Sequence, residues 1–506
     1  MIRFTLWICM ALAMTVPSNA GLVLAKVFTD HAVIQAGKPV KVWGTAVSKE
    51  AVTVQLGGIT QKVSADDSGH WLATFGPMPA SYQSFDLKVT DGHQTLTCNN
   101  LLAGEVWLAN GQSNMQWALK QSTGGREAIK SCDDPHLRFF HHLGTLHPGS
   151  KKYPREFLAR LNTNNYYQSN GWEPCDAKSA ANFSAVAYFF AKKLRETLDV
   201  PVGIIALPVG GSPIEAHLPN DAFTSNPELK PLLHHWWKNP DYPQWCRQRA
   251  ALNLTHWLAD PEKGKAPPHP FAPTFLWQAG IDPLLHFPIK GVIWYQGESN
   301  ATVDGGRGAA MPKAINHVKL VALINAYRRH WSDPSLPFYH VQLPGMNRDW
   351  MLFREMQDEV THELTNLGMA VAIDVGHPGN VHPPDKQPVG SRLARLALSQ
   401  VYGKNIECHG PLPTQITLRQ SEVVIRFTHA KGLRSVDGRA PKTFELAGDN
   451  GIFHPATASI KKDSITLTSE EVDQPVAVRY AWADHPDVNL VNGSWLPAPP
   501  FRRKIK

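Results

Sequence analysis

The sequence has few of the features that mark several large classes of protein. Only 18% of its 506 residues are charged, and the formal charge of +7 comes from Lys and Arg residues that are scattered along the chain. This pattern gives no indication of a nucleic-acid partner. No Cys-x-x-Cys occurs, which argues against a zinc ribbon or a thioredoxin-like site. No apolar run after residue 20 is long enough for a membrane helix.

Residues 1–20 have the pattern of a secretory signal peptide. Arg3 supplies the positive end, Phe4 to Val16 form an apolar stretch too short to span a bilayer, and Ser18-Asn19-Ala20 is a small-x-small cleavage site. The alternative is an uncleaved anchor. We expect an exported, soluble protein, secreted or periplasmic, or lysosomal or extracellular in a eukaryote, with no membrane partner after cleavage.

Cysteine is scarce, with six residues in the chain. Cys9 is lost with the signal peptide, and five remain. An odd number in an oxidising compartment leaves at least one thiol unpaired within the chain. Cys132 and Cys175 are a candidate pair, although sequence alone does not establish pairing.

The sequence patterns at both ends of the mature chain predict β-structure. Within residues 21–103, alternating runs such as Val40–Trp43 and Val52–Leu56 are separated by Gly, Asp and Ser turns. Short strands at this spacing are typical of a small β-sandwich. The same alternation returns in residues 405–506, for example in Glu422–Phe427, and predicts a second β-rich domain.

Residues 104–404 alternate between strand and helix patterns. The amphipathic stretches Ser184–Leu198 and Ile315–His330 predict helices between short, uninterrupted apolar runs. The predicted strands are Glu105–Ala109, Gly203–Val209, Gly291–Tyr295, Phe338–Leu343 and Met369–Asp374. This order favours an α/β domain with a doubly wound sheet. The Pro- and Trp-rich residues 217–290 predict loops and short helices over the active face.

Ser113 stands at a junction suited to a nucleophile. A strand ends at Asn110-Gly111, and a helix pattern begins near Ser113 and runs through Trp117 and Leu119. The carboxyl edge of a parallel sheet is where such folds bind ligands, and the first N–H groups of a helix favour developing negative charge. The alternative is that Ser113 only caps the helix. The elbow Gly-x-Ser-x-Gly is absent, which disfavours the α/β-hydrolase arrangement.

Four stretches in order resemble one family. Gly111–Met115 is similar to the first block of the SGNH hydrolases, in the form found in sialate O-acetylesterases. Lys26–His31, Trp294–Ala301 and Val381–Lys386 also match, so the resemblance covers nearly the whole mature chain. It implies an SGNH-type α/β/α hydrolase domain flanked by N-terminal and C-terminal β-sandwich-like domains.

The resemblance also implies roles for residues. His382 follows the last predicted strand, and without the family match it would be one turn histidine among 23. The family places its catalytic histidine at this position, so His382 is the predicted base for Ser113. The predicted oxyanion donors are the Ser113 N–H, the Gly211 N–H in preference to that of Gly210, and the Gln296 side chain.

The group that orients the imidazole is the weak point of the pattern. The family often carries Asp three residues before the histidine, and here that residue is Gly379. Three alternatives remain open: Asp374, the Asn380 side chain, or a backbone carbonyl near Gly379 that leaves a Ser–His dyad. The dyad is slightly favoured, and Asp374 comes next.

The remaining polar residues have weaker assignments. The predicted substrate contacts are Asn114, Glu298 and Asn300, although the last two are equally consistent with a hydrogen-bonded turn. The spacings of His377, His382 and Asp385 fit no common zinc signature, so no metal is expected.

Together these residues predict a serine esterase without a cofactor. We expect it to hydrolyse O-acetyl esters of carbohydrates, most of all O-acetylated sialic acids. One alternative is an esterase acting on acetylxylan or another plant polysaccharide. A second is a catalytically impaired sugar-binding protein, suggested by Gly379 and Asn380. The oligomeric state is not predicted.

Overall fold

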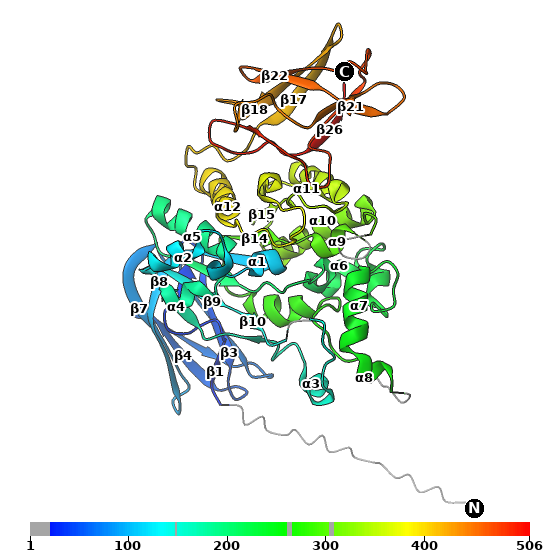
Figure 1. Ribbon diagram of the computed structural model, residues 1–506. Coiled ribbons are helices and arrows are strands. Elements are labelled where there is room, and N and C mark those ends of the chain that lie inside the picture. The colour runs from blue at the N-terminus through cyan, green and yellow to red at the C-terminus, as the bar shows by residue number, and fades with distance from the viewer. Residues whose placement is uncertain (1–20, 147–148, 261–265, 303–307, 506) are drawn as a thin grey trace, which may run out of the picture.

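The computed structural model describes residues 21–146, 149–260, 266–302 and 308–505. The predicted signal peptide, residues 1–20, lies outside the described residues. Figure 1 shows the N-terminal strands at one end of the molecule, a middle part of strands and helices, and the C-terminal strands at the other end.

The alternating N-terminal runs form strands, which pair antiparallel except for β2, which lies parallel to β8. Their bounds are β1 (Val23–Leu24), β2 (Val33–Gln35), β3 (Val40–Thr45), β4 (Ala51–Leu56), β5 (Ile59–Ser64), β6 (His70–Phe75) and β7 (Ser81–Thr90). β1, β3 and β6 make one sheet, while β5, β4 and β7 join the next strand, β8. Every second residue of β6 is buried, so the period of two reflects one face packed on a core.

Strand β8 (Thr95–Gly111) is one continuous strand of 17 residues. Its first half pairs with β7 and β2, and its second half, from Glu105, pairs with β13 and β14. The predicted strand Glu105–Ala109 is the middle of this longer strand. The partner strands of β8 change between Gly104 and Glu105.

A parallel sheet forms the middle of the molecule. Its order is β9 (Asp134–His141), β13 (Val202–Ala206), β8, β14 (Gly291–Tyr295), β15 (Phe338–Val341) and β16 (Leu367–Ala370), with β12 (Trp172–Cys175) antiparallel beside β9. Four of the predicted strands largely coincide with strands of this sheet, whereas the predicted Met369–Asp374 overlaps β16 only at Met369 and Ala370. β9 and β12 were not predicted, because Asp134, Pro135 and His136 break the apolar pattern of β9. The result is an α/β fold.

Helices pack on this sheet. The long ones are α5 (Ala185–Leu198), α10 (Lys313–His330), α11 (Met351–Glu363) and α12 (Gln387–Gln400). The predicted start of α5 is confirmed, because Ser184 is its N-cap and accepts a hydrogen bond from the Ala187 N–H at 3.1 Å. Residues 217–290 contain short elements, as predicted: α6 (Asn220–Thr224), α7 (Gln244–Asn253), α8 (Thr255–Leu258) and single turns. Among the described residues, no helix is long and apolar enough to cross a membrane.

The C-terminal residues return to strands. One sheet has the order β17 (Leu412–Arg419), β18 (Glu422–Thr428), β23 (Ser464–Thr468), β22 (Thr457–Lys461). The other has the order β21 (Phe453–Pro455), β20 (Phe444–Ala447), β24 (Ala477–Tyr480), β26 (Phe501–Lys504), and β19 (Arg434–Ser435) pairs with β25 (Leu490–Val491). Both sheets contribute to one apolar core that includes Ile425 and Val478.

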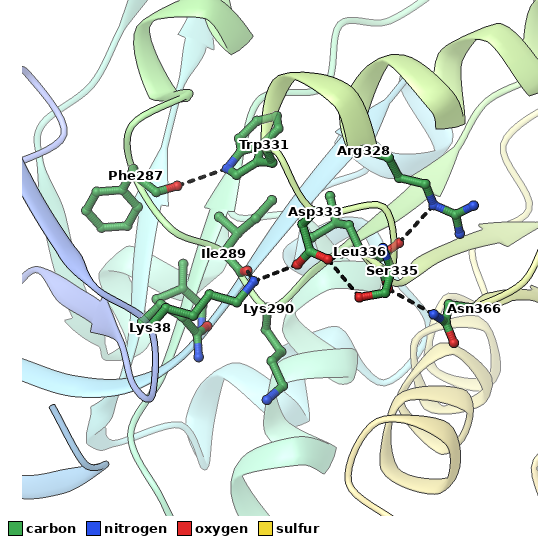
Figure 2. Close-up of polar contacts among 12 residues, drawn as sticks. Lys38, Phe287, Ile289, Lys290, Arg328, Trp331, Asp333, Ser335, Leu336 and Asn366 are labelled. Atoms are coloured by element: carbon green, nitrogen blue, oxygen red, sulfur yellow. Dashed lines mark hydrogen bonds and ion pairs between the residues drawn. The ribbon is translucent and has the colours of Figure 1, made fainter. Parts of the chain in front are cut away.

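Polar contacts join the N-terminal strands to the middle of the molecule (Figure 2). Lys38, between β2 and β3, donates from Nζ to the Ile289 carbonyl at 3.0 Å and to Asp333 Oδ2 at 2.9 Å. The Trp331 indole N–H donates to the Phe287 carbonyl at 3.0 Å. These contacts hold the segment before β14 and the end of α10 against the N-terminal strands.

The five cysteines after the predicted signal peptide are thiols in this structure. Cys132 and Cys175 are buried and hydrogen-bonded to each other, which makes them neighbours as well as a candidate pair. Burial raises the pKa of the Cys132 thiol.

Candidate active site

Helix α1 (Ser113–Gln116) begins directly after β8. Gly111 ends the strand with φ +137°, and a Cβ there would lie 2.1 Å from the Tyr295 carbonyl oxygen, so the close approach of β8 to β14 requires glycine. The helix is shorter than predicted and ends at Gln116. The N-cap is Gln112, so the alternative in which Ser113 is only a cap is wrong.

Ser113 is the first helical residue and is partly exposed, whereas its neighbours Gln112 and Asn114 are buried. The first N–H groups of a helix have no partner within the helix. This position therefore presents a hydroxyl together with N–H donors at the carboxyl edge of the parallel sheet.

The predicted base lies against the same helix. The Asn114 side chain donates from Nδ2 to the Val381 carbonyl at 2.9 Å. The ring of Trp117 stacks on the ring of His382, with 5.2 Å between centroids and 24° between planes. Trp117 follows Ser113 by about one helical turn. The structure thus brings His382, 269 residues away in the chain, to the helix that begins with Ser113.

A buried chain of polar groups extends from this contact. Asn114 is fully buried, and its Nδ2 also donates to Glu298 Oε1. Its Oδ1 accepts from Lys386 Nζ at 2.5 Å. Burial lowers the pKa of Lys386 to about 7 and raises the pKa of Glu298. Asn114 therefore joins α1, the loop that carries His382 and the start of α9 (Glu298–Ala301).

This burial corrects two predicted substrate contacts. Asn114 has an exposed fraction of 0% and Glu298 of 3%, and both side chains bond to protein groups. A sugar cannot reach them without opening these loops. Their observed contacts hold the loops around Ser113 together.

Two candidates for orienting His382 have other bonds in the structure. Both oxygens of Asp374, in the turn Ile373–Val375, accept from the Arg392 guanidinium at 2.6 Å. The Asn380 Oδ1 accepts from the backbone N–H of His382 at 2.9 Å, so this side chain shapes the turn. Which of Asp374, Asn380 and the carbonyl near Gly379 orients the ring stays a prediction.

The two glycines after β13 differ in their hydrogen bonding. The Gly210 N–H donates to Gln116 Oε1 at 3.0 Å. The Gly211 N–H has no acceptor in the part of the chain that the structure describes. Gly211 has φ +74°, a conformation that favours glycine. The bonding pattern therefore supports Gly211 over Gly210 as an oxyanion donor.

Gln296 is placed differently from the prediction. Its exposed fraction is 1%, and its Nε2 donates to the Ser212 carbonyl at 3.1 Å and to Asn300 Oδ1 at 2.8 Å. Both amide hydrogens are thus used within the protein, and donation to an oxyanion would require one bond to break. The contacts show Gln296 supporting the loop after β13.

Asn300 belongs to the same buried group of polar side chains as Gln296 and is not a sugar contact. It has an exposed fraction of 0%, its Oδ1 also accepts from the Ile214 N–H at 3.0 Å, and its Nδ2 donates to Glu215 Oε2 at 2.9 Å. Glu215 Oε1 lies 2.7 Å from Lys319 Nζ, in an ion pair with both side chains fully buried. Removing one partner of such a pair leaves an uncompensated buried charge.

A second serine–histidine contact lies among these buried polar side chains. Ser212 Oγ is 2.8 Å from His217 Nε2, which is hydrogen-bonding distance for a nucleophile and its base. Both residues have an exposed fraction of 0%, and burial lowers the pKa of His217 to about 3. Because no substrate can reach Ser212, this pair stabilises the structure and does not catalyse the reaction.

Two residues of the site carried no predicted role. Trp117 was read only as part of the helix after Ser113, although its spacing of four residues puts it over the next turn. Lys386 was noted only as the end of a matching block. In the sequence, Lys386 stands in a proline-rich turn that leads into a helix. This local pattern does not indicate that the lysine is buried.

Comparisons with known proteins identify similar carbohydrate esterases. The family model described as carbohydrate esterase, sialic acid-specific acetylesterase matches residues 279–399. The sialate O-acetylesterase of Rattus norvegicus is 29% identical over 527 residues, covering 92% of this chain and 91% of the relative. The human sialate O-acetylesterase is 28% identical over 513 residues, covering 91% and 88%.

A solved structure extends the likeness to the fold. The crystal structure of a carbohydrate acetylesterase from Xanthomonas citri superposes with a TM-score of 0.77 at 32% identity, covering 95% of this chain and 99% of that one. This likeness spans the N-terminal strands, the parallel sheet and the C-terminal strands. The alternative of an impaired sugar-binding protein is not favoured. The chain belongs to this family of carbohydrate acetylesterases and is a carboxylic ester hydrolase.

Proposed function

We propose that the protein is a serine esterase that removes O-acetyl groups from sialic acids. Ser113 is the nucleophile and His382 is the general base. The substrate follows from the sialate O-acetylesterases that match more than nine-tenths of the chain, and from the family model over residues 279–399.

In the proposed reaction, Ser113 Oγ attacks the acetyl carbonyl while His382 takes its proton. The Ser113 and Gly211 N–H groups stabilise the tetrahedral anion. His382 then protonates the sugar oxygen as it leaves. A water molecule, activated by His382, attacks the acetyl-enzyme, and acetate and free Ser113 result.

One observation carries this assignment. The loop Val381–Lys386 is docked on α1, through the Asn114 side chain and the stacking of Trp117 on His382. A nucleophile and a base from distant parts of the chain are therefore supported by one short helix. The ring of His382 is oriented in part by this stacking, which restricts its rotation.

The test is acetate release from O-acetylated sialic acid by residues 21–506. Ser113→Ala and His382→Ala should each lose at least a thousandfold in kcat. His377→Ala removes an exposed histidine from the same loop and should keep wild-type activity. Acetylated xylan serves as the competing substrate. Full activity in Ser113→Ala, or a preference for xylan, would contradict the proposal.

Three further parts of the sequence prediction stand as proposals. The parallel sheet and its helices form an SGNH-type hydrolase domain over residues 104–404. The strands of residues 21–103 and 405–506 form flanking β-sandwich-like domains. Residues 1–20 direct export and are removed, which N-terminal sequencing of the secreted protein would test.

A further inference from the structure

A cavity of about 790 Å³ lies beside the parallel sheet. Its walls come from residues 26–29, from 141–143 at the end of β9, from 167–173 leading into β12, and from 178–182 around α4 (Ala177–Ala181). The register relates it to the strand that leads to Ser113: His141 of β9 pairs with Ala206 of β13, which pairs with Ala109 of β8, four residues before Ser113. Two strand spacings, about 10 Å, therefore separate His141 from Ala109.

The rim of the cavity is continuous with the segment that follows Ser113. Asn182 lines the cavity, and the carbonyl of the next residue, Phe183, accepts from the Leu119 N–H at 2.9 Å. The Ala185 N–H donates to the Trp117 carbonyl at 2.8 Å. Helix α4 contacts α2 (Gly125–Lys130) and the turn Leu119–Gln121 that follows α1. Hydrogen-bonded segments therefore connect the cavity to the helix that begins with Ser113.

The lining combines rings with polar side chains. Phe28 and Tyr167 contribute aromatic rings, and Gln168, Asn170 and Asn182 contribute amides. Ligand sites typically combine apolar and aromatic walls with a few polar groups that fix orientation. The volume is also within the range of small-molecule sites, about 300–1,000 Å³. A sugar ring with several hydroxyl groups matches this lining.

The charges favour an anion. Lys26 and Lys178 line the cavity against a single carboxylate, Glu173. Burial lowers the pKa values of His141 and His142 to about 4, so both rings are neutral at pH 7. The two lysines therefore leave an excess of one positive charge.

Both lysines are exposed, so their ammonium groups can turn toward a bound ligand. Lys26 Nζ makes one long hydrogen bond, 3.4 Å, to the Asn164 carbonyl, and an ammonium group has three hydrogens to donate.

We propose that this cavity binds the carboxylate-bearing sugar of the substrate, with Lys26 and Lys178 facing its carboxylate. The acetyl ester of the same glycan then extends along the sheet edge to Ser113. This inference rests on the proposed function, and it adds the location and the charged groups that select an acidic sugar.

The test measures binding of free N-acetylneuraminic acid to the whole mature chain by calorimetry at low salt. K26A/K178A should weaken binding at least tenfold. K62A/K130A removes two exposed lysines elsewhere, changes the net charge equally, and should stay within twofold of wild type. Neutral N-acetylglucosamine should bind at least tenfold more weakly than the acid. Unchanged affinity in K26A/K178A, or equal affinity for the neutral sugar, would overturn the assignment.

Parallel kinetics separate this inference from the proposed function. K26A/K178A should raise KM for O-acetylated sialic acid at least tenfold with little change in kcat, and should leave hydrolysis of p-nitrophenyl acetate unchanged. Lysine-dependent binding without acetate release would reject the proposed function and leave the cavity as an acidic-sugar site. Acetate release with an unchanged KM in K26A/K178A would reject the cavity alone.

Discussion

Replacing Asn114 with alanine tests whether the buried chain around α1 positions the catalytic groups. The change removes the hydrogen bonds to Val381, Glu298 and Lys386. A neutral hydrogen bond contributes about 1 kcal/mol to stability, and one to a charged group contributes about 1.5–3 kcal/mol. Because the three share one side chain, we expect a loss of about 3–5 kcal/mol in the free energy of unfolding.

Replacing Asn114 should also lower the rate of acetate release. Without Asn114 the loop carrying His382 loses its hydrogen bond to α1, and a displacement of about 1 Å can cost about a hundredfold in rate. We therefore expect kcat for acetate release to fall about a hundredfold in the folded variant. Guanidinium unfolding and steady-state kinetics, both at a temperature where the variant is folded, measure the two effects.

Asn253→Ala is the matched control. Asn253 is also fully buried, and its side chain bonds to the Gly149 and Lys151 carbonyls and to His269. This variant should lose a similar amount of stability and keep kcat within about threefold of wild type. Equal losses of kcat in both variants, or wild-type kcat in Asn114→Ala, would refute the reasoning.

Three further predictions concern the same site. Trp117→Leu should lower kcat about tenfold, because stacked rings contribute about 0.5–1.5 kcal/mol, while Trp117→Phe should keep most activity in steady-state assays. Asp374→Asn should lower the free energy of unfolding by about 1–3 kcal/mol through its bond to Arg392, and kcat should stay within about threefold. A hundredfold loss of kcat would instead identify Asp374 as the orienting acid. Lys386→Met should change the pH dependence of stability. The pKa of Lys386 falls from 10.5 to about 7 on folding, so the unfolded chain binds more protons between these values. Wild type should therefore gain up to about 1.4 kcal/mol per pH unit relative to Lys386→Met from pH 7 to 9, measured by guanidinium unfolding, and a flat difference would contradict the lowered pKa.

Strand and helix patterns predicted the layout because each reflects local burial. The five predicted strands of the parallel sheet are short apolar runs, and in the structure β13 and β14 are buried along their whole length. The last two strands on one side of the sheet, β9 and the edge strand β12, were not predicted. β9 and β12 carry polar residues and a proline, so their sequences resemble loops until the neighbouring strand supplies their partners.

The sequence by itself determined the order of elements, the junction at Ser113, and the blocks that contain His382 and Gly211. These depend on local periodicity, on glycine at a tight junction, and on short motifs. Only the tertiary structure decided what each polar side chain contacts. Asp374 bonds to Arg392, Asn300 to Glu215 and Ile214, and Asn114 to Lys386 and Glu298. Each partner is at least 18 residues away in the chain, and no local pattern encodes such pairs. Burial then set the pKa of Lys386, because desolvation depends on every segment packed around the group rather than on its neighbours in the chain.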